Sequence, residues 1–162
     1  MKIRSVRANS RRKAFEVAIS GQLLVFPYAK ASPRPTATDP VETCGADPEL
    51  GREAFTYALA SGIEGAIHID QVREYNQDPA YLREALLYSM KIEAQRRVAA
   101  SPLSKREIIR RLGTSATQFY RLLDQTNTRT SLDRLLDLLH ILDCEVRMSV
   151  RVRSPRRSPI AT

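Results

Sequence analysis

The clearest pattern in the chain is a pair of short amphipathic helices within residues 103–124. Apolar residues recur every three or four positions in both, which is the spacing of one helix face. The predicted buried positions are Ile108, Ile109 and Leu112 in the first helix, and Ala116, Phe119, Leu122 and Leu123 in the second. Gly113 lies between them, where a residue free to adopt a positive φ ends a helix. The pattern predicts two helices joined by a tight turn.

A capping motif precedes each helix. Ser104 and Glu107 have the S-x-x-E spacing of a capping box, and Ser115 and Gln118 repeat it as S-x-x-Q. In such a box the two residues exchange side-chain hydrogen bonds with each other's backbone amides. Two helices joined by so few residues must cross steeply, as in a helix-turn-helix. If the apolar face of the second helix is buried, the exposed side chains are Thr117, Tyr120, Arg121 and Asp124.

Residues 103–124, followed by SLDRLLDLLHILDCEV, resemble the helix-turn-helix of bacterial and phage repressors of the Cro/C1-like (xenobiotic-response-element) family. The resemblance covers about residues 80–150. The matched positions are Gly113 in the turn and Ile108, Leu112, Phe119 and Leu122 in the core. Ile109 departs from the small residue usual there, and Phe119 from the usual aliphatic residue. The resemblance implies a sequence-specific, repressor-like bacterial regulator of transcription, which binds double-stranded DNA without a cofactor.

The resemblance also assigns roles to exposed residues on and beside the second helix. Side chains expected to reach base edges in the major groove are Thr117, Gln118, Tyr120 and Arg121. The expected phosphate contacts are Lys105, Arg106, Ser115, Asn127, Thr128 and Arg129. Ser115 and Ala116 are also expected to present the amides of a helix N-terminus to the DNA backbone.

The first 78 residues predict β structure instead. Phe15, Val17 and Ile19 alternate with other residues, and an apolar run over 23–26 follows a turn at Gly21, which predicts a hairpin. Residues 3–7 are a possible third strand. Residues 30–50 contain four prolines and predict a loop or linker. Residues 55–70 predict a second hairpin, with a helix over residues 51–60 as the alternative. This part is similar to a small uncharacterised N-terminal domain of bacterial proteins, which implies no activity.

The expected fold class is therefore α+β, with a small β-rich N-terminal domain over residues 1–78. A mostly helical, phage-repressor-like helix-turn-helix domain over residues 79–153 follows, then a disordered basic tail over residues 154–162. Two further helices are expected to bury stripes of apolar residues: Leu82, Leu86, Met90, Ala94 and Val98 in the first, and Leu132, Leu135, Leu136, Leu139 and Leu142 in the second. Thr130 or Ser131 is expected to cap the second of these helices.

The segment after the last helix changes from helical to strand spacing. Val146, Met148, Val150 and Val152 alternate with Arg147, Ser149, Arg151 and Arg153, which predicts a C-terminal strand. A single strand needs a partner edge. It either joins the N-terminal sheet or pairs with its copy in a second subunit, and the second arrangement would build the homodimer that repressors of this type use.

Charge separates the two halves of the chain. Residues 1–90 carry eleven basic and eleven acidic residues, whereas residues 91–162 carry fifteen basic and seven acidic, the whole net charge of +8. A basic module beside a neutral one is typical of a protein that binds phosphates. The alternative function is a protein-interaction module, such as an antitoxin-like partner or adaptor, in which the helix-turn-helix is mainly a scaffold.

Catalytic and metal-binding patterns are missing from the sequence. Cys44 and Cys144 are far apart, and so are His68 and His140, and neither pair has the spacing of a metal or redox site. No glycine-rich phosphate loop or nucleophile motif occurs, so we do not expect an enzyme. We expect a reducing, cytoplasmic location, because no signal peptide or membrane-spanning apolar stretch is evident.

Overall fold

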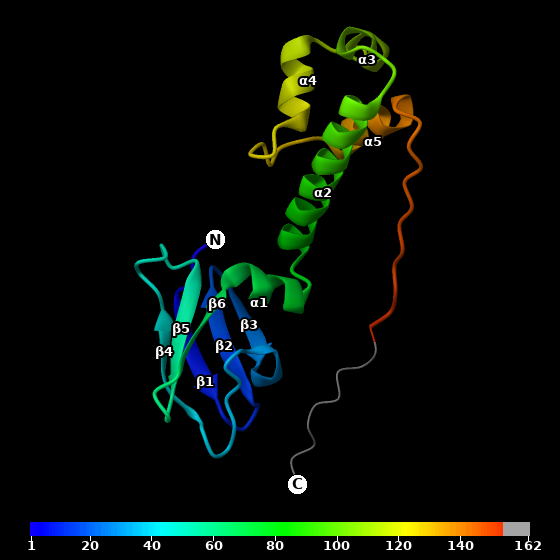
Figure 1. Ribbon diagram of the computed structural model, residues 1–162. Coiled ribbons are helices and arrows are strands. Elements are labelled where there is room, and N and C mark those ends of the chain that lie inside the picture. Colours follow the sequence, from blue (N-terminus) through cyan, green and yellow to red (C-terminus); the bar gives the residue numbers. More distant parts are fainter. Residues whose placement is uncertain (154–162) are drawn as a thin grey trace. The chain divides into compact units, whose positions relative to one another are not determined.

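The computed structural model describes residues 1–153, which divide into two compact units (Figure 1). The first unit is Met1–Tyr81, and the second begins at Leu82. The described residues form two three-stranded antiparallel sheets and five α-helices, so the predicted α+β class is confirmed. No helix within this described range is long and apolar enough to cross a membrane.

The first sheet contains the N-terminal hairpin and the predicted third strand. Its antiparallel order is β1-β2-β3, with the strands Ser5–Asn9, Ala14–Ile19 and Gln22–Pro27. The alternation seen in the sequence places Phe15, Val17 and Ile19 in the core, where all three are buried. A 3-10 turn, Tyr28–Lys30, follows the sheet.

The second sheet confirms one prediction and corrects another. Its strands β4, β5 and β6 are Val41–Ala46, Ala54–Leu59 and Glu64–His68. β5 and β6 form the predicted second hairpin, and the alternative helix over residues 51–60 is wrong. The predicted loop over residues 30–50 is also wrong in part, because β4 pairs with β5 from within it. β4 carries few apolar side chains, so its backbone pairing with β5 defines it more than its sequence does.

Aromatic side chains from both sheets form the centre of the first unit. The Phe15 ring lies 5.0 Å from the ring of Phe55 and 4.9 Å from those of Tyr57 and Tyr28, between centroids. Helix α1 (Ile69–Asn76) closes this core with the buried side chains of Ile69 and Val72. The sequence pattern did not predict α1, which has only these two buried apolar residues.

Gly65 leaves the space that Tyr57 occupies. The two residues are opposite each other in β6 and β5, and a Cβ atom at position 65 would lie 2.5 Å from the Tyr57 hydroxyl oxygen. That hydroxyl donates a hydrogen bond to the Pro33 carbonyl oxygen at 2.6 Å, which holds the ring in place. A side chain at position 65 therefore overpacks the sheet.

We expect Gly65→Ala to lower the free energy of unfolding by about 1–3 kcal/mol, the usual cost of overpacking a core. Urea unfolding followed by circular dichroism measures this change. Gly45→Ala in β4 is the matched control, because no atom lies within 4 Å of a Cβ added there. Equal effects of the two substitutions would contradict the proposed close packing of Tyr57 over Gly65.

The second unit is helical. It contains the long helix α2 (Pro79–Ala100), most of which lies beyond the unit boundary, and the helices α3 (Lys105–Leu112), α4 (Ala116–Leu123) and α5 (Leu132–Ile141). Their shared core consists of Leu87, Met90, Ala94, Val98, Ile108, Leu112, Phe119, Leu122, Leu123, Leu135, Leu138 and Leu139.

Two predicted apolar stripes need correction. On α2, Leu82 and Leu86 are exposed, and the buried face begins at Leu87 instead. On α5, Leu132 and Leu136 are exposed, whereas Leu138 is buried. Both shifts have one cause, since each helix touches its neighbours along only part of its length, and the packing selects a narrower stripe than the sequence offers.

The predicted C-terminal strand is wrong for the chain by itself. Residues 144–153 follow α5 without entering either sheet (Figure 1). A strand is defined by hydrogen bonds to a neighbour, and alternation of side chains does not provide that neighbour. The predicted basic tail, residues 154–162, lies outside the described residues.

Candidate nucleic-acid interface

Both ends of α3 are capped as the sequence suggests. The Ser104 hydroxyl oxygen accepts a hydrogen bond from the Glu107 amide at 3.1 Å. Gly113 ends the helix at φ 67° and ψ 38°, a left-handed conformation that favours glycine. The reciprocal half of the predicted capping box is wrong, because the Glu107 carboxylate bonds to the side chains of Arg110 and Arg111.

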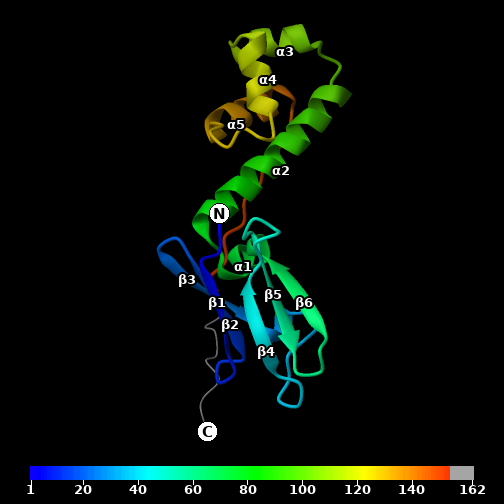
Figure 2. The same ribbon diagram turned by 90° about the vertical axis from the view of Figure 1, so that its left-hand side faces the viewer.

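Helix α4 begins immediately after this turn. The Ser115 hydroxyl oxygen accepts a hydrogen bond from the Gln118 amide at 3.2 Å. The views in Figure 1 and Figure 2 show α3 and α4 running steeply across one another. Phe119, fully buried, and Leu122 fix α4 in the core. Ala116 is exposed, so its predicted burial is wrong: the packed face of α4 begins one turn later.

The outer face of α4 carries the predicted base-reading residues. Thr117, Gln118, Tyr120 and Arg121 are all exposed. Tyr120 is held by its neighbours, since its ring packs edge-on against Phe119 with 5.4 Å between centroids. The Lys105 ammonium nitrogen lies 5.9 Å from the centre of the Tyr120 ring. The predicted phosphate-binding Arg106 is also exposed on α3.

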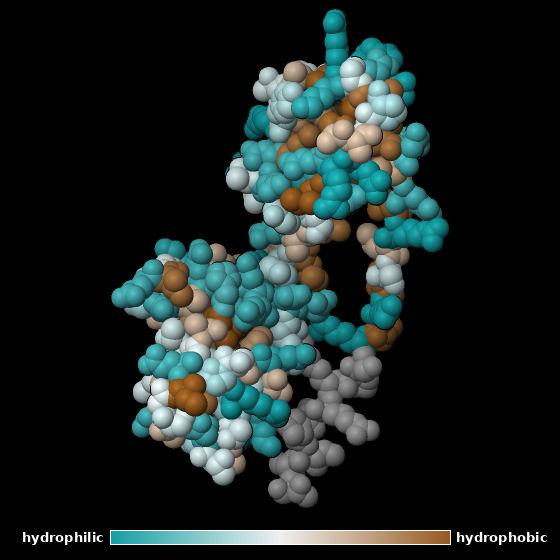
Figure 3. Space-filling view, in the orientation of Figure 1, coloured by the Kyte–Doolittle hydropathy of each residue, from teal (hydrophilic) through white to brown (hydrophobic). Residues whose placement is uncertain are grey.

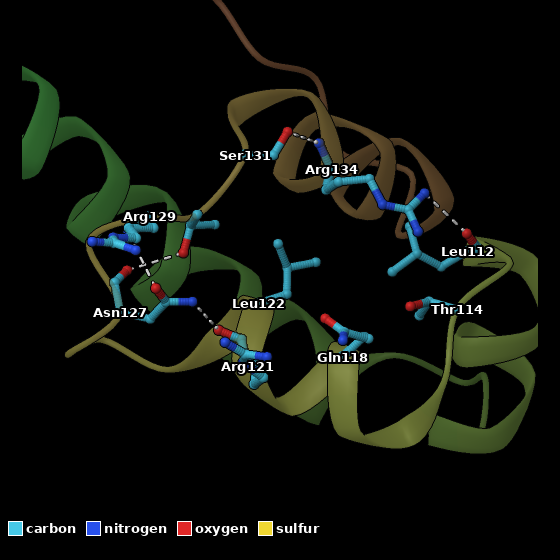
Figure 4. A pocket seen from close by; sticks show the side chains of 10 residues that line it. Leu112, Thr114, Gln118, Arg121, Leu122, Asn127, Arg129, Ser131 and Arg134 are labelled. Carbon is cyan, nitrogen blue, oxygen red and sulfur yellow. Dashed lines mark hydrogen bonds between the residues drawn. The ribbon is translucent and has the colours of Figure 1, made fainter.

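A basic hollow of about 440 Å³ opens beside this face. Figure 4 shows its lining side chains, which come from the end of α3, from α4, from the α4–α5 loop and from the start of α5. Arg121, Arg129 and Arg134 line it from three different elements, and no acidic side chain does. Gln118, Thr114 and Ser131 add polar groups to the same wall. Clustered arginines without acids are suited to binding an anion.

The loop between α4 and α5 has a fixed internal structure. The Asn127 side-chain amide donates to the Arg121 carbonyl oxygen at 3.2 Å, and its oxygen accepts from the Arg129 amide at 3.1 Å. The carbonyl oxygen of the exposed residue Thr128 accepts a hydrogen bond from the Arg83 guanidinium of α2 at 2.9 Å. Asn127 therefore shapes the loop that presents Arg129, rather than offering a free side chain.

The end of α4 is tied to α2 by a buried lysine. Lys91 is only 1% exposed, and its ammonium donates hydrogen bonds to the carbonyl oxygens of Asp124, at 2.6 Å, and Asn127. Gln95 on the next turn of α2 donates to the Leu123 carbonyl oxygen at 2.8 Å. Burial lowers the pKa of Lys91, while the nearby Asp124 carboxylate opposes this shift. A cation at a helix C-terminus is stabilising, so Lys91 positions α4 and the loop together.

The sequence interpretation missed Lys91 and Arg134. Lys91 follows Leu87 by four residues and precedes Ala94 by three, so its place on the buried face of α2 was detectable. Ser131 is the N-cap of α5, which selects it over Thr130. Arg134, in the first turn of α5, donates to the Leu112 carbonyl oxygen at the end of α3, 3.3 Å away. No local signal predicts that contact, because its partner is 22 residues away.

Glu107 neutralises part of the positive charge of α3. Its carboxylate accepts hydrogen bonds from Arg110 at 2.6 Å and from Arg111 at 2.9 Å. These bonds, with that from Arg110 the stronger influence, lower the pKa of Glu107 to about 2. A carboxyl group with a depressed pKa in the folded state stabilises the fold above its ordinary pKa, and this stability is lost as the pH falls toward the folded value.

We therefore expect Glu107→Gln to reduce the dependence of stability on pH between about pH 5 and pH 2, the window that the pKa shift defines. Thermal unfolding of the wild-type chain and the variant at each pH measures the difference. The two melting temperatures should converge as the pH approaches 2, because the wild-type carboxyl group is then also protonated. A difference that stays constant over the whole pH range would contradict this role of the ion pairs.

Other chemistry is not evident in the described part of the chain. Residues 1–153 contain no group of three histidine, cysteine or acidic side chains placed to hold a metal ion. Both cysteines are free. The only feature of this unit that gathers several charged side chains of one sign around a hollow is the arginine cluster beside α4. Comparison of the chain with protein-family models, curated proteins and solved structures finds no match.

Proposed function

We propose that this chain is a sequence-specific DNA-binding protein, a transcriptional regulator in which α3 and α4 act as a phage-repressor-like helix-turn-helix. The observation that carries the proposal is the acid-free hollow lined by Arg121, Arg129 and Arg134 beside the exposed face of α4. Residues 82–153 also carry fourteen basic and eight acidic residues. Positive charge concentrated beside an exposed helix face is the electrostatic pattern of nucleic-acid binding.

In this proposal α4 enters the major groove of double-stranded DNA. Gln118 and Arg121 read base edges, because both lie on the outer face and their length allows paired hydrogen bonds to adenine and guanine. Thr117 and Tyr120 contact neighbouring bases or sugars. Arg129, Lys105 and Arg106 contact phosphates, and the amides at the start of α4, around Ser115 and Ala116, meet the DNA backbone.

Two single substitutions test the division between base reading and phosphate binding. After a preferred site has been selected from random DNA, we expect Arg121→Ala to lose about 1–3 kcal/mol of preference at one base pair. Arg129→Ala should weaken binding to all sequences alike and reduce the salt dependence by about one phosphate contact. Binding titrations on the selected site, its single-base variants and unrelated DNA distinguish the two effects. Unchanged preference in Arg121→Ala would reject base reading by Arg121.

A further inference from the structure

We propose that residues 144–152 pair with the same segment of a second copy of this chain, as an antiparallel two-stranded ribbon centred on Met148. The segment has the side-chain pattern of a strand but no strand partner among the described residues. Met148, Val150 and Val152 are 76%, 87% and 98% exposed. Figure 3 shows apolar and hydrophilic residues following one another along this exposed segment. The proposal does not depend on DNA binding.

The backbone of the segment offers a free pairing edge. The last backbone hydrogen bond before it joins the Cys144 amide to the Leu139 carbonyl oxygen at 2.9 Å. From Glu145 to Val152, no backbone–backbone hydrogen bond is made to any other described residue. Unpaired amides and carbonyls in a stretch rich in β-branched residues form a template for another strand.

The charges of the segment favour its own copy and select one register. When two antiparallel copies are centred on Met148, Glu145 lies opposite Arg151, and Arg147 lies opposite Ser149. Opposite charges on directly facing residues stabilise a strand pair, whereas like charges destabilise it. A register moved by one residue, centred on Ser149, would place Arg147 opposite Arg151. Self-pairing in the first register therefore avoids the repulsion that six basic and acidic side chains in two short strands would otherwise create.

The same register matches the apolar face. Val146 lies opposite Val150, and Met148 lies opposite itself across the two-fold axis. Such a self-complementary contact is the ordinary form of a two-fold dimer interface. Cys144 is half-buried and packs against the core of the helical unit, so the segment is anchored at its start. Pairing of the segments would therefore join two helical units.

A charge exchange on the full-length chain tests both the partner and the register. We expect the wild-type chain to sediment as a concentration-dependent dimer. Glu145→Arg and Arg151→Glu should each weaken dimerisation by about tenfold, because each places like charges opposite one another twice in the symmetric pair. The double variant Glu145→Arg/Arg151→Glu restores opposite charges and should regain most of the affinity. Arg106→Glu on α3, also an exposed arginine, is the control and should leave the dimer unchanged.

Every outcome of this experiment bears on the proposal. A wild-type chain that remains monomeric at all accessible concentrations overturns it, and so does a dimer that neither single substitution weakens. Weakening in both single variants without recovery in the double variant rejects the register centred on Met148. Because sedimentation is measured without DNA, a failure here leaves the proposed DNA binding separately testable.

Discussion

Replacing Asp78 with alanine is expected to lower the free energy of unfolding of the first unit by about 3–5 kcal/mol, the usual cost of leaving one charge of a buried pair without its partner. Asp78 accepts a hydrogen bond from the Arg73 guanidinium at 2.8 Å, and both side chains are almost fully buried. Asp78 also accepts from the Tyr81 amide at 3.3 Å, so it caps the start of α2 as well. The Arg73 guanidinium lies 5.3 Å from the centre of the Tyr81 ring.

Asp70→Ala is the matched control for this prediction. Asp70 also pairs with Arg73, at 3.7 Å, but its side chain is half exposed. Exposed ion pairs contribute about 0–1 kcal/mol, so this variant should unfold almost like the wild type. Chemical denaturation followed by the fluorescence of the tyrosines gives both values. If Asp78→Ala costs no more than Asp70→Ala, the buried pair is not a main determinant of stability in this unit.

The second large effect concerns the arginine hollow. Replacing Arg121, Arg129 and Arg134 together with glutamine is expected to weaken binding to random-sequence DNA on the order of a hundredfold to a thousandfold near 0.1 M salt. Each lost phosphate contact removes about 0.9 from the slope of affinity against salt on logarithmic axes. The slope should therefore become flatter by nearly three. Fluorescence anisotropy with a labelled duplex measures affinity and slope together.

The control for this variant changes the same charge elsewhere. Arg11, Lys30 and Arg34 are exposed residues of the first unit, and their replacement with glutamine alters the net charge equally. That variant should keep most of the affinity if position, rather than total charge, determines binding. Equal losses in the two triple variants would show that the hollow has no special role. Circular dichroism of both variants checks that Arg134, which also bonds to Leu112, is not required for folding.

The elements that the sequence predicted are those whose own residues define them. The hairpin around Gly21 alternates clearly, and the turn between α3 and α4 has a serine cap on each side of Gly113. β4 was missed because its residues gain strand geometry only by pairing with β5. The C-terminal segment shows the opposite case, with strong alternation over residues 146–152 but no neighbour within the chain.

The candidate site was only partly predictable for a similar reason. Exposure of Thr117, Tyr120 and Arg121 follows from helical spacing alone, once Phe119 is taken as buried. The basic hollow depends on Arg134, whose neighbours come from a distant part of the sequence. The buried position of Lys91 depends on carbonyl groups that become available only when α4 ends beside α2. Contacts of this kind are properties of the folded chain and not of any single helix.

The most direct test of the proposed DNA binding is a titration of the full-length chain against random-sequence duplex DNA at about 50 mM and about 200 mM salt. If the three arginines of the hollow neutralise three phosphates, the affinity should fall by at least about fortyfold between these conditions. Selection of a preferred site would then follow. Absence of binding even at the lower salt concentration, or binding that does not change with salt, would contradict the account and favour a protein-interaction module instead.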